Sequence, residues 1–89
     1  MTPRGAVTPI PVRALCFGIL RDAVGRREIE LQLTGTTVAD VWVALLAEHA
    51  GLAAHRRWVK VAINERYAEW EDVVKEGDVV AFIPPVAGG

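Results

Sequence analysis

The stretch that decides the fold is REIELQLTGTTVADVWVALLAEHAG, residues 27–51, because its hydrophobic period changes part-way along. Residues 27–33 alternate between apolar and polar side chains, which predicts a strand with one buried face. The side chains expected to face inward are Ile29, Leu31 and Leu33, and those expected to face water are Glu28, Glu30 and Gln32.

The second half of the stretch predicts a helix. Thr37 lies three residues before Asp40, a variant of the capping box that opens many helices. Apolar side chains then recur at helical spacing. They are Val38, Val41, Trp42, Leu45, Leu46 and, at the end, His49. We expect Gly51 to end this helix and its one apolar face to pack across a sheet.

Three further apolar runs are short enough to be strands: residues 11–18, 58–63 and 79–83. In the first run, Val12, Ala14 and Cys16 point one way, and Arg13, Leu15 and Phe17 point the other. Residues 19–25 are expected to form a short helical turn closed by Gly25.

The remaining elements are short. Asn64-Glu65 indicates a tight turn into a strand at residues 66–68. Residues 70–75 are ambiguous, and residues 76–78 indicate another turn. The resulting order, β-β-α-β-β-β, predicts an α+β fold in which one helix lies on a mixed sheet. The β-grasp fold has this order, and we expect its first and last strands to pair.

Length and composition point to a single small domain. The chain has 89 residues, a net charge of −1 and 24% charged residues, so no basic face for nucleic acid and no basic helix for membranes is expected. We expect a flexible extension at residues 1–10, a β-grasp domain at 11–83 and an extended tail at 84–89. With one cysteine and no apolar leader segment, the chain is expected to be cytoplasmic.

The chain ends in FIPPVAGG, residues 82–89. Pro84 and Pro85 lack an N–H, so sheet pairing must weaken there, and six residues reach roughly 20 Å. The ionised terminal carboxylate, with a pKa near 3.5, is a poor electrophile. Activation as an acyl-adenylate, followed by displacement of AMP by a sulfur donor, would give a thiocarboxylate on Gly89.

Three segments resemble the small, sulfur-carrier subunits of molybdopterin synthase, a ubiquitin-like β-grasp family. They are VRALCFGILRDAVGRREIEL (12–31), VAINERY (61–67) and EGDVVAFIPPVAGG (76–89). Gly18 stands where family members often carry Ala, a departure for which we expect no consequence.

The resemblance implies a role and partners. An adenylating enzyme related to ubiquitin-activating enzymes and a sulfur donor would convert Gly89 to the thiocarboxylate, with AMP attached only transiently and no permanent cofactor. The tail, consisting of Pro85, Val86, Ala87 and Gly88 before Gly89, would enter the large, catalytic synthase subunit. Sulfur would pass there to a pyranopterin precursor, so the chain alone is not expected to catalyse a reaction.

Several side chains are expected at the partner interface or in the core. Phe17 and Ile83 fall where the family presents apolar side chains to the large subunit. Phe82 is included in the interface as well, although adjacent strand residues point to opposite faces, so only one of Phe82 and Ile83 can be core. Cys16 is expected to be a small buried hydrophobe rather than a thiol relay.

The tryptophans and histidines are not expected to form a site. Trp42, Trp58 and Trp70 are expected to belong to the core, and Trp70 is expected to be partly exposed. His49 and His55 have no partners at metal-ligand spacing, so no metal site is expected.

Three alternatives remain open. The first is a carrier of the same fold for thiamine or cysteine synthesis, although the Pro-Pro before the tail favours molybdopterin. The second is a ubiquitin-like modifier of target lysines, which uses the same adenylate chemistry. The third is a plain interaction domain with an incidental Gly-Gly end.

Overall fold

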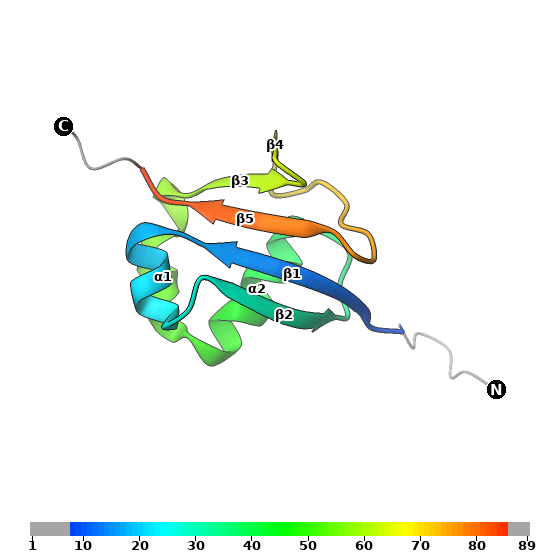
Figure 1. Cartoon of the computed structure of the whole chain (residues 1–89), viewed down its shortest axis with the longest axis horizontal. Coiled ribbons are helices and arrows are strands. Elements are labelled where there is room, and N and C mark those ends of the chain that lie inside the picture. Colours follow the sequence, from blue (N-terminus) through cyan, green and yellow to red (C-terminus); the bar gives the residue numbers. More distant parts are fainter. Residues whose placement is uncertain (1–7, 86–89) are drawn as a thin grey trace.

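The computed structural model describes residues 8–85 and contains a five-stranded mixed sheet with helices on one face (Figure 1). The strands are β1 (Ile10–Cys16), β2 (Glu28–Leu33), β3 (Lys60–Ile63), β4 (Arg66–Ala68) and β5 (Val79–Ile83). Their order across the sheet is β2-β1-β5-β3-β4. β1 and β5 are parallel, and all other neighbours are antiparallel. The predicted β-grasp arrangement, including the pairing of the first and last strands, is confirmed.

The strict alternation in β2 has the expected result. Ile29 and Leu33 are buried, while Glu28 and Glu30 are exposed on the opposite face. In β1, the same period buries the predicted set, Val12, Ala14 and Cys16. β1 begins at Ile10, one residue earlier than expected.

The main helix, α2 (Val38–Glu48), crosses one face of the sheet (Figure 1). Its start is the predicted capping box: the Asp40 backbone N–H donates to Thr37 Oγ1 at 3.3 Å, and the Thr37 N–H donates to Asp40 Oδ2 at 2.9 Å. The Asp40 carboxylate also accepts from the Thr36 N–H at 2.8 Å. These hydrogen bonds to the charged form lower the pKa of Asp40.

The predicted end of this helix at Gly51 is wrong. The last N–H in α-helical register is that of His49, which donates to Leu45 O at 2.9 Å. The Leu52 N–H then donates to His49 O at 3.0 Å, a tighter spacing of three residues. The chain continues as a 3₁₀ segment, η1 (Ala50–Trp58), which buries Leu52. The next strand therefore begins at Lys60 rather than at residue 58.

The shorter elements agree with their predictions. Helix α1 (Gly18–Val24) ends at Gly25, whose φ of 91° is left-handed. The β3–β4 turn uses Asn64 and Glu65, both with positive φ, as tight hairpin turns require. The Asn64 side chain accepts from the Val79 N–H at 2.9 Å, which ties this turn to the start of β5.

An aromatic cluster fills the space between α2 and the sheet. The Trp42 ring lies 5.2 Å from that of Phe82 and 5.6 Å from that of Trp70, between centroids. Trp42 is buried and Trp70 half-buried, as expected. Trp58 is the exception, because it ends η1 on the surface and is 60% exposed.

Candidate functional site

The last strand delivers the C-terminal segment to one end of the sheet. β5 is the central strand, and its final pairs are Phe82 with Cys16 of β1 and Ile83 with Lys60 of β3. Pro84 follows directly and has no N–H to continue the ladder. The chain therefore leaves at the end of the sheet where β1 finishes and β3 starts (Figure 1).

The exit is closely packed against Gly18, the first residue of α1. Gly18 has a φ of 54°, and a Cβ built on it would lie 3.0 Å from Pro84 Cγ. A side chain here would be strained by the backbone and would press on the proline ring. Glycine meets both the positive φ and the close approach of Pro84 without strain, and the expectation that this departure from alanine has no consequence stays a prediction.

The predicted interface residues separate onto two faces. Phe82 exposes 0% of its surface and lies in the aromatic cluster beneath α2. Its inclusion in the interface is wrong, because its register with Cys16 and Val61 turns it toward the core. Ile83 points the other way and is half-buried, as is Phe17.

Phe17 and Ile83 line a shallow groove on the face of the sheet away from α2. Its volume is about 340 Å³. The other residues around it are Leu15, Ala62, Glu65, Tyr67, Val79 and Ala81. Ala62 and Ala81 pair across β3 and β5, so two small side chains stand in the middle of this face. Tyr67 beside them is 81% exposed.

Sequence reasoning placed Phe17 and Ile83 in this surface but missed its other members. The alternation of β1 already put Leu15 on the side of Phe17. A similar signal lay in β5, where Val79, Ala81 and Ile83 share a face by their spacing of two. Such an apolar groove suits docking of another protein.

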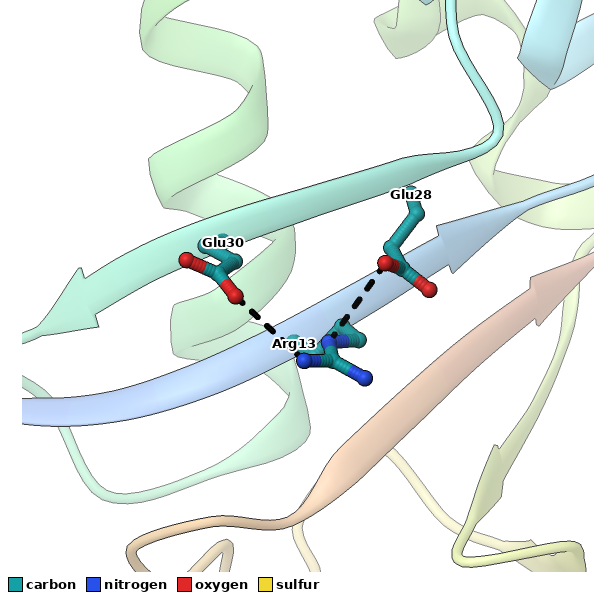
Figure 2. Close-up of polar contacts among 3 residues, drawn as sticks. All are labelled: Arg13, Glu28 and Glu30. Carbon is teal, nitrogen blue, oxygen red and sulfur yellow. Dashed lines mark hydrogen bonds and ion pairs between the residues drawn. The ribbon is translucent and has the colours of Figure 1, made fainter.

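A charged cluster borders the groove on β1 and β2. The Arg13 guanidinium lies between two carboxylates, with Nε 3.7 Å from Glu28 Oε2 and an NH2 group 3.3 Å from Glu30 Oε1 (Figure 2). All three side chains are open to solvent. Such pairs contribute little to stability, so the cluster marks the polar edge of the groove rather than a reactive centre.

The Cys16 thiol is not accessible to a reaction partner. Cys16 is completely buried, and burial raises the pKa of its thiol to about 11. Within residues 8–85, no group of three or more His, Cys, Asp or Glu side chains could hold a metal ion. No helix in that range has the length and apolar character needed to cross a membrane.

Pro85 is exposed at the last described position. The predicted tail residues Val86, Ala87, Gly88 and Gly89 lie outside the described residues. The site that the structure describes therefore consists of the exit at Pro84 and Pro85 and the adjoining groove.

Comparison with known proteins decides the family. The model of the ThiS family matches residues 14–89, which includes both the groove and the C-terminus. The chain belongs to the ThiS family. The chain is 40% identical over 83 residues to the molybdopterin synthase sulfur carrier subunit of Mycobacterium tuberculosis, covering 90% of this chain and 99% of that protein. The resemblance found in the sequence is confirmed.

Solved structures agree with the fold of this ThiS-family chain. SAMP1 of Haloferax volcanii superimposes with a TM-score of 0.77 at 27% identity, covering 89% of this chain and 99% of the other. SAMP1 stands for small archaeal modifier protein 1. A chain from the BexX/CysO complex of Amycolatopsis orientalis gives a TM-score of 0.70 at 29% identity, covering 88% and 99%.

Proposed function

We propose that the chain is a sulfur carrier for molybdopterin synthesis and that its reactive group is the α-carboxylate of Gly89. The observation that carries this proposal is the family match, which extends through residue 89, together with a 40% identical relative named as such a carrier. The burial and raised pKa of Cys16 support a reaction at the chain end instead of at the thiol.

The chemistry begins with activation of the carboxylate. A carboxylate oxygen of Gly89 attacks the α-phosphorus of ATP, and pyrophosphate leaves. Hydrosulfide, or a donor at the same oxidation level, then adds to the acyl carbon. AMP departs with its bridging oxygen, one proton is released, and a thiocarboxylate remains.

Sulfur transfer follows in the large synthase subunit. The thiocarboxylate sulfur forms a bond to a carbon of the pyranopterin precursor while a carbon–oxygen bond at that carbon breaks. The oxygen group leaves with the bonding electrons, and the product is a thioester. Water then cleaves the acyl–sulfur bond, leaving the sulfur on the precursor and the carboxylate on Gly89. Each cycle therefore returns the carrier unchanged, with no permanently bound cofactor and AMP attached only during activation.

The fold contributes delivery. The tail, with Pro85, Val86, Ala87 and Gly88 ahead of Gly89, reaches roughly 20 Å from Pro84 when extended. Small residues at its end suit a narrow channel in the partner. The packing of Pro84 against Gly18 supports a fixed starting direction for the tail.

The groove that contains Phe17 and Ile83 is the proposed docking surface for the large subunit. Its apolar lining and half-buried side chains are typical of the centre of a protein interface. The Amycolatopsis orientalis neighbour comes from a complex, which supports a partner subunit for this fold. An adenylating enzyme and a sulfur donor complete the set of partners, and ATP and reduced sulfur favour the cytoplasm.

A second candidate function is modification of protein lysines, which the name of the SAMP1 neighbour favours. It requires the same adenylate, which a lysine amine would attack to form an amide. This chain contains only Lys60 and Lys75, so extension into polymers has few acceptors. A carrier for thiamine or cysteine synthesis would differ only in the acceptor of the sulfur.

Reconstitution tests the proposal. The chain, an adenylating enzyme, ATP and sulfide are combined, and the large subunit and pyranopterin precursor are then added. We expect the sulfur-containing pterin to form with the wild-type chain and none with a variant lacking Gly89. Formation of lysine conjugates without the pterin would contradict the carrier function and support the modifier.

A further inference from the structure

A second hollow lies beside the exit of the tail and shares no residue with the groove on the open face of the sheet. Its volume is about 190 Å³. Its lining comes from α1, from η1 and the residue after it, and from the chain after β5. The lining residues are Ile19, His55, Trp58, Val59, Pro84 and Pro85. We call these six residues the Trp58 patch.

Two large apolar side chains of the Trp58 patch are open to solvent. Trp58 is 60% exposed and Ile19 is 52% exposed. Trp42 is buried and Trp70 is half-buried, so the core of this small domain accommodates large aromatic rings, and Trp58 nevertheless lies on the surface. Exposed aromatic and aliphatic side chains around a hollow are a feature of protein contact sites.

The segment that carries Trp58 has a strong excess of positive charge. Residues 49–64 contain three fixed cations, Arg56, Arg57 and Lys60, and no Asp or Glu. The guanidinium carbon of Arg57 lies 5.4 Å from the centroid of the Trp58 ring, so one cation adjoins the patch directly. Arg56 turns instead toward Trp70, at 4.1 Å.

Among the residues that the structure describes, Arg57 differs from Arg13 in its lack of a carboxylate partner. Arg13 is neutralised by two glutamates (Figure 2). Within residues 8–85, the ion pairs that the structure contains all involve Arg13, and Arg57 has no carboxylate partner. A cation beside an exposed tryptophan matches a partner surface that presents an apolar side chain flanked by carboxylates.

We propose that the Trp58 patch and Arg57 form a second contact area for the large synthase subunit, whose surface carries acidic side chains around the entrance for the tail. This inference rests on the proposed function. Pro84 and Pro85 belong both to the patch and to the root of the tail. Four residues separate Pro85 from the chain end and span at most about 13 Å. Because the tail is this short, a partner that encloses Gly89 must approach the root of the tail, where Trp58 lies beside Pro84 and Pro85.

Binding of the chain to the purified large subunit of the same organism tests the inference. Trp58→Ala and Arg57→Glu are each expected to weaken binding by about tenfold or more. Arg57→Glu is also expected to reduce the loss of affinity with rising salt. The matched controls are Val43→Ala, an exposed apolar residue on α2, and Arg66→Glu. Arg66 pairs with Ile63, at the other end of the sheet from Ile83.

The outcomes separate the two proposals. If the wild-type chain binds and Arg57→Glu and Trp58→Ala behave as their controls do, the second contact area is overturned while the carrier function stands. If the wild-type chain does not bind the large subunit, the carrier function is contradicted as well. If the wild-type chain forms dimers that Trp58→Ala dissociates, and the variant binds the large subunit with unchanged affinity, the second contact area is overturned and the patch is assigned to self-association. Because Arg57 is exposed, its variant remains informative even if Trp58→Ala fails to fold.

Discussion

The two faces of the sheet are built from the same strands but have different compositions. The face beneath α2 is wholly apolar and almost inaccessible, with Val12, Ala14, Cys16, Val61, Val80 and Phe82. The opposite face combines a half-buried apolar groove with exposed charges at Arg13, Glu28 and Glu30. Because strand side chains alternate, one strand can supply stability on one face and recognition on the other.

The largest expected effect on stability comes from truncating the neighbouring residues Phe82 and Ile83 one at a time. Phe82→Ala removes a fully buried ring that contacts Trp42 and Trp70, and we expect it to lower the free energy of unfolding by about 3–5 kcal/mol. Ile83→Ala truncates a half-buried side chain and should cost about 1 kcal/mol or less. Chemical denaturation measures both values. Equal losses would contradict the division of the two faces.

Ile83 also tests the proposed role of the open face in recognition. We expect Ile83→Ala to weaken binding of the large subunit, because Ile83 lines the docking groove. Binding is measured under conditions in which both proteins are folded. Unchanged affinity of Ile83→Ala would remove the groove from the interface.

An intermediate effect is expected at Gly18, where the chain leaves the sheet. Gly18→Ala places a side chain at a φ of 54° and should cost about 1–2 kcal/mol. It should also slow sulfur transfer in the reconstituted system, because the new Cβ pushes on Pro84. Gly25→Ala is the matched control, since Gly25 has a φ of 91° and no atom near its Cβ position. If the two variants transfer sulfur equally well, Gly18 does not direct the tail.

A smaller effect is expected at the cap of the helix that covers the inner face. Asp40→Ala removes the carboxylate that accepts from Thr36 and Thr37 and should cost about 1 kcal/mol at neutral pH. The folded state lowers the pKa of Asp40, so the stabilisation is present above the unfolded pKa of about 4 and is lost as the pH falls through the folded value. The difference in unfolding free energy between wild type and Asp40→Ala should therefore be smaller at pH 3 than at pH 7. A constant difference would show that the charge is irrelevant.

The smallest effect is expected on the charged edge of the open face. Glu30→Gln breaks a solvent-exposed pair with Arg13 and should change the unfolding free energy by less than about 0.5 kcal/mol. Raising the salt to about 1 M should remove even that difference. A loss comparable to that of Phe82→Ala would mean that the open face shares the stabilising role of the inner one.

Local patterns predicted most of this architecture. The period of two in residues 27–33, the Thr37–Asp40 cap and the turn at Asn64 each contain enough local information to fix an element. The pairing of β1 with β5 followed from the order of the elements. In each case the physical cause lies within a few residues or in chain topology.

The remaining features depend on long-range packing. Which of Phe82 and Ile83 is buried is decided by the register of β5 against Cys16 and Val61. The change to 3₁₀ spacing after His49 is accompanied by burial of Leu52, and it leaves Trp58 on the surface. The groove likewise needs side chains from β1, β3, β4 and β5 together. Periodicity within one segment contains none of this information.

The most direct test of the central claim is to locate the transferred sulfur by intact-mass and fragment-ion mass spectrometry. Wild type and Cys16→Ala are each incubated with the adenylating enzyme, ATP and sulfide. We expect both chains to gain about 16 Da, the difference between sulfur and oxygen, with the added mass at Gly89. An unchanged mass at Gly89 in both chains, while the adenylating enzyme consumes ATP, would contradict the claim that the chain end carries the sulfur.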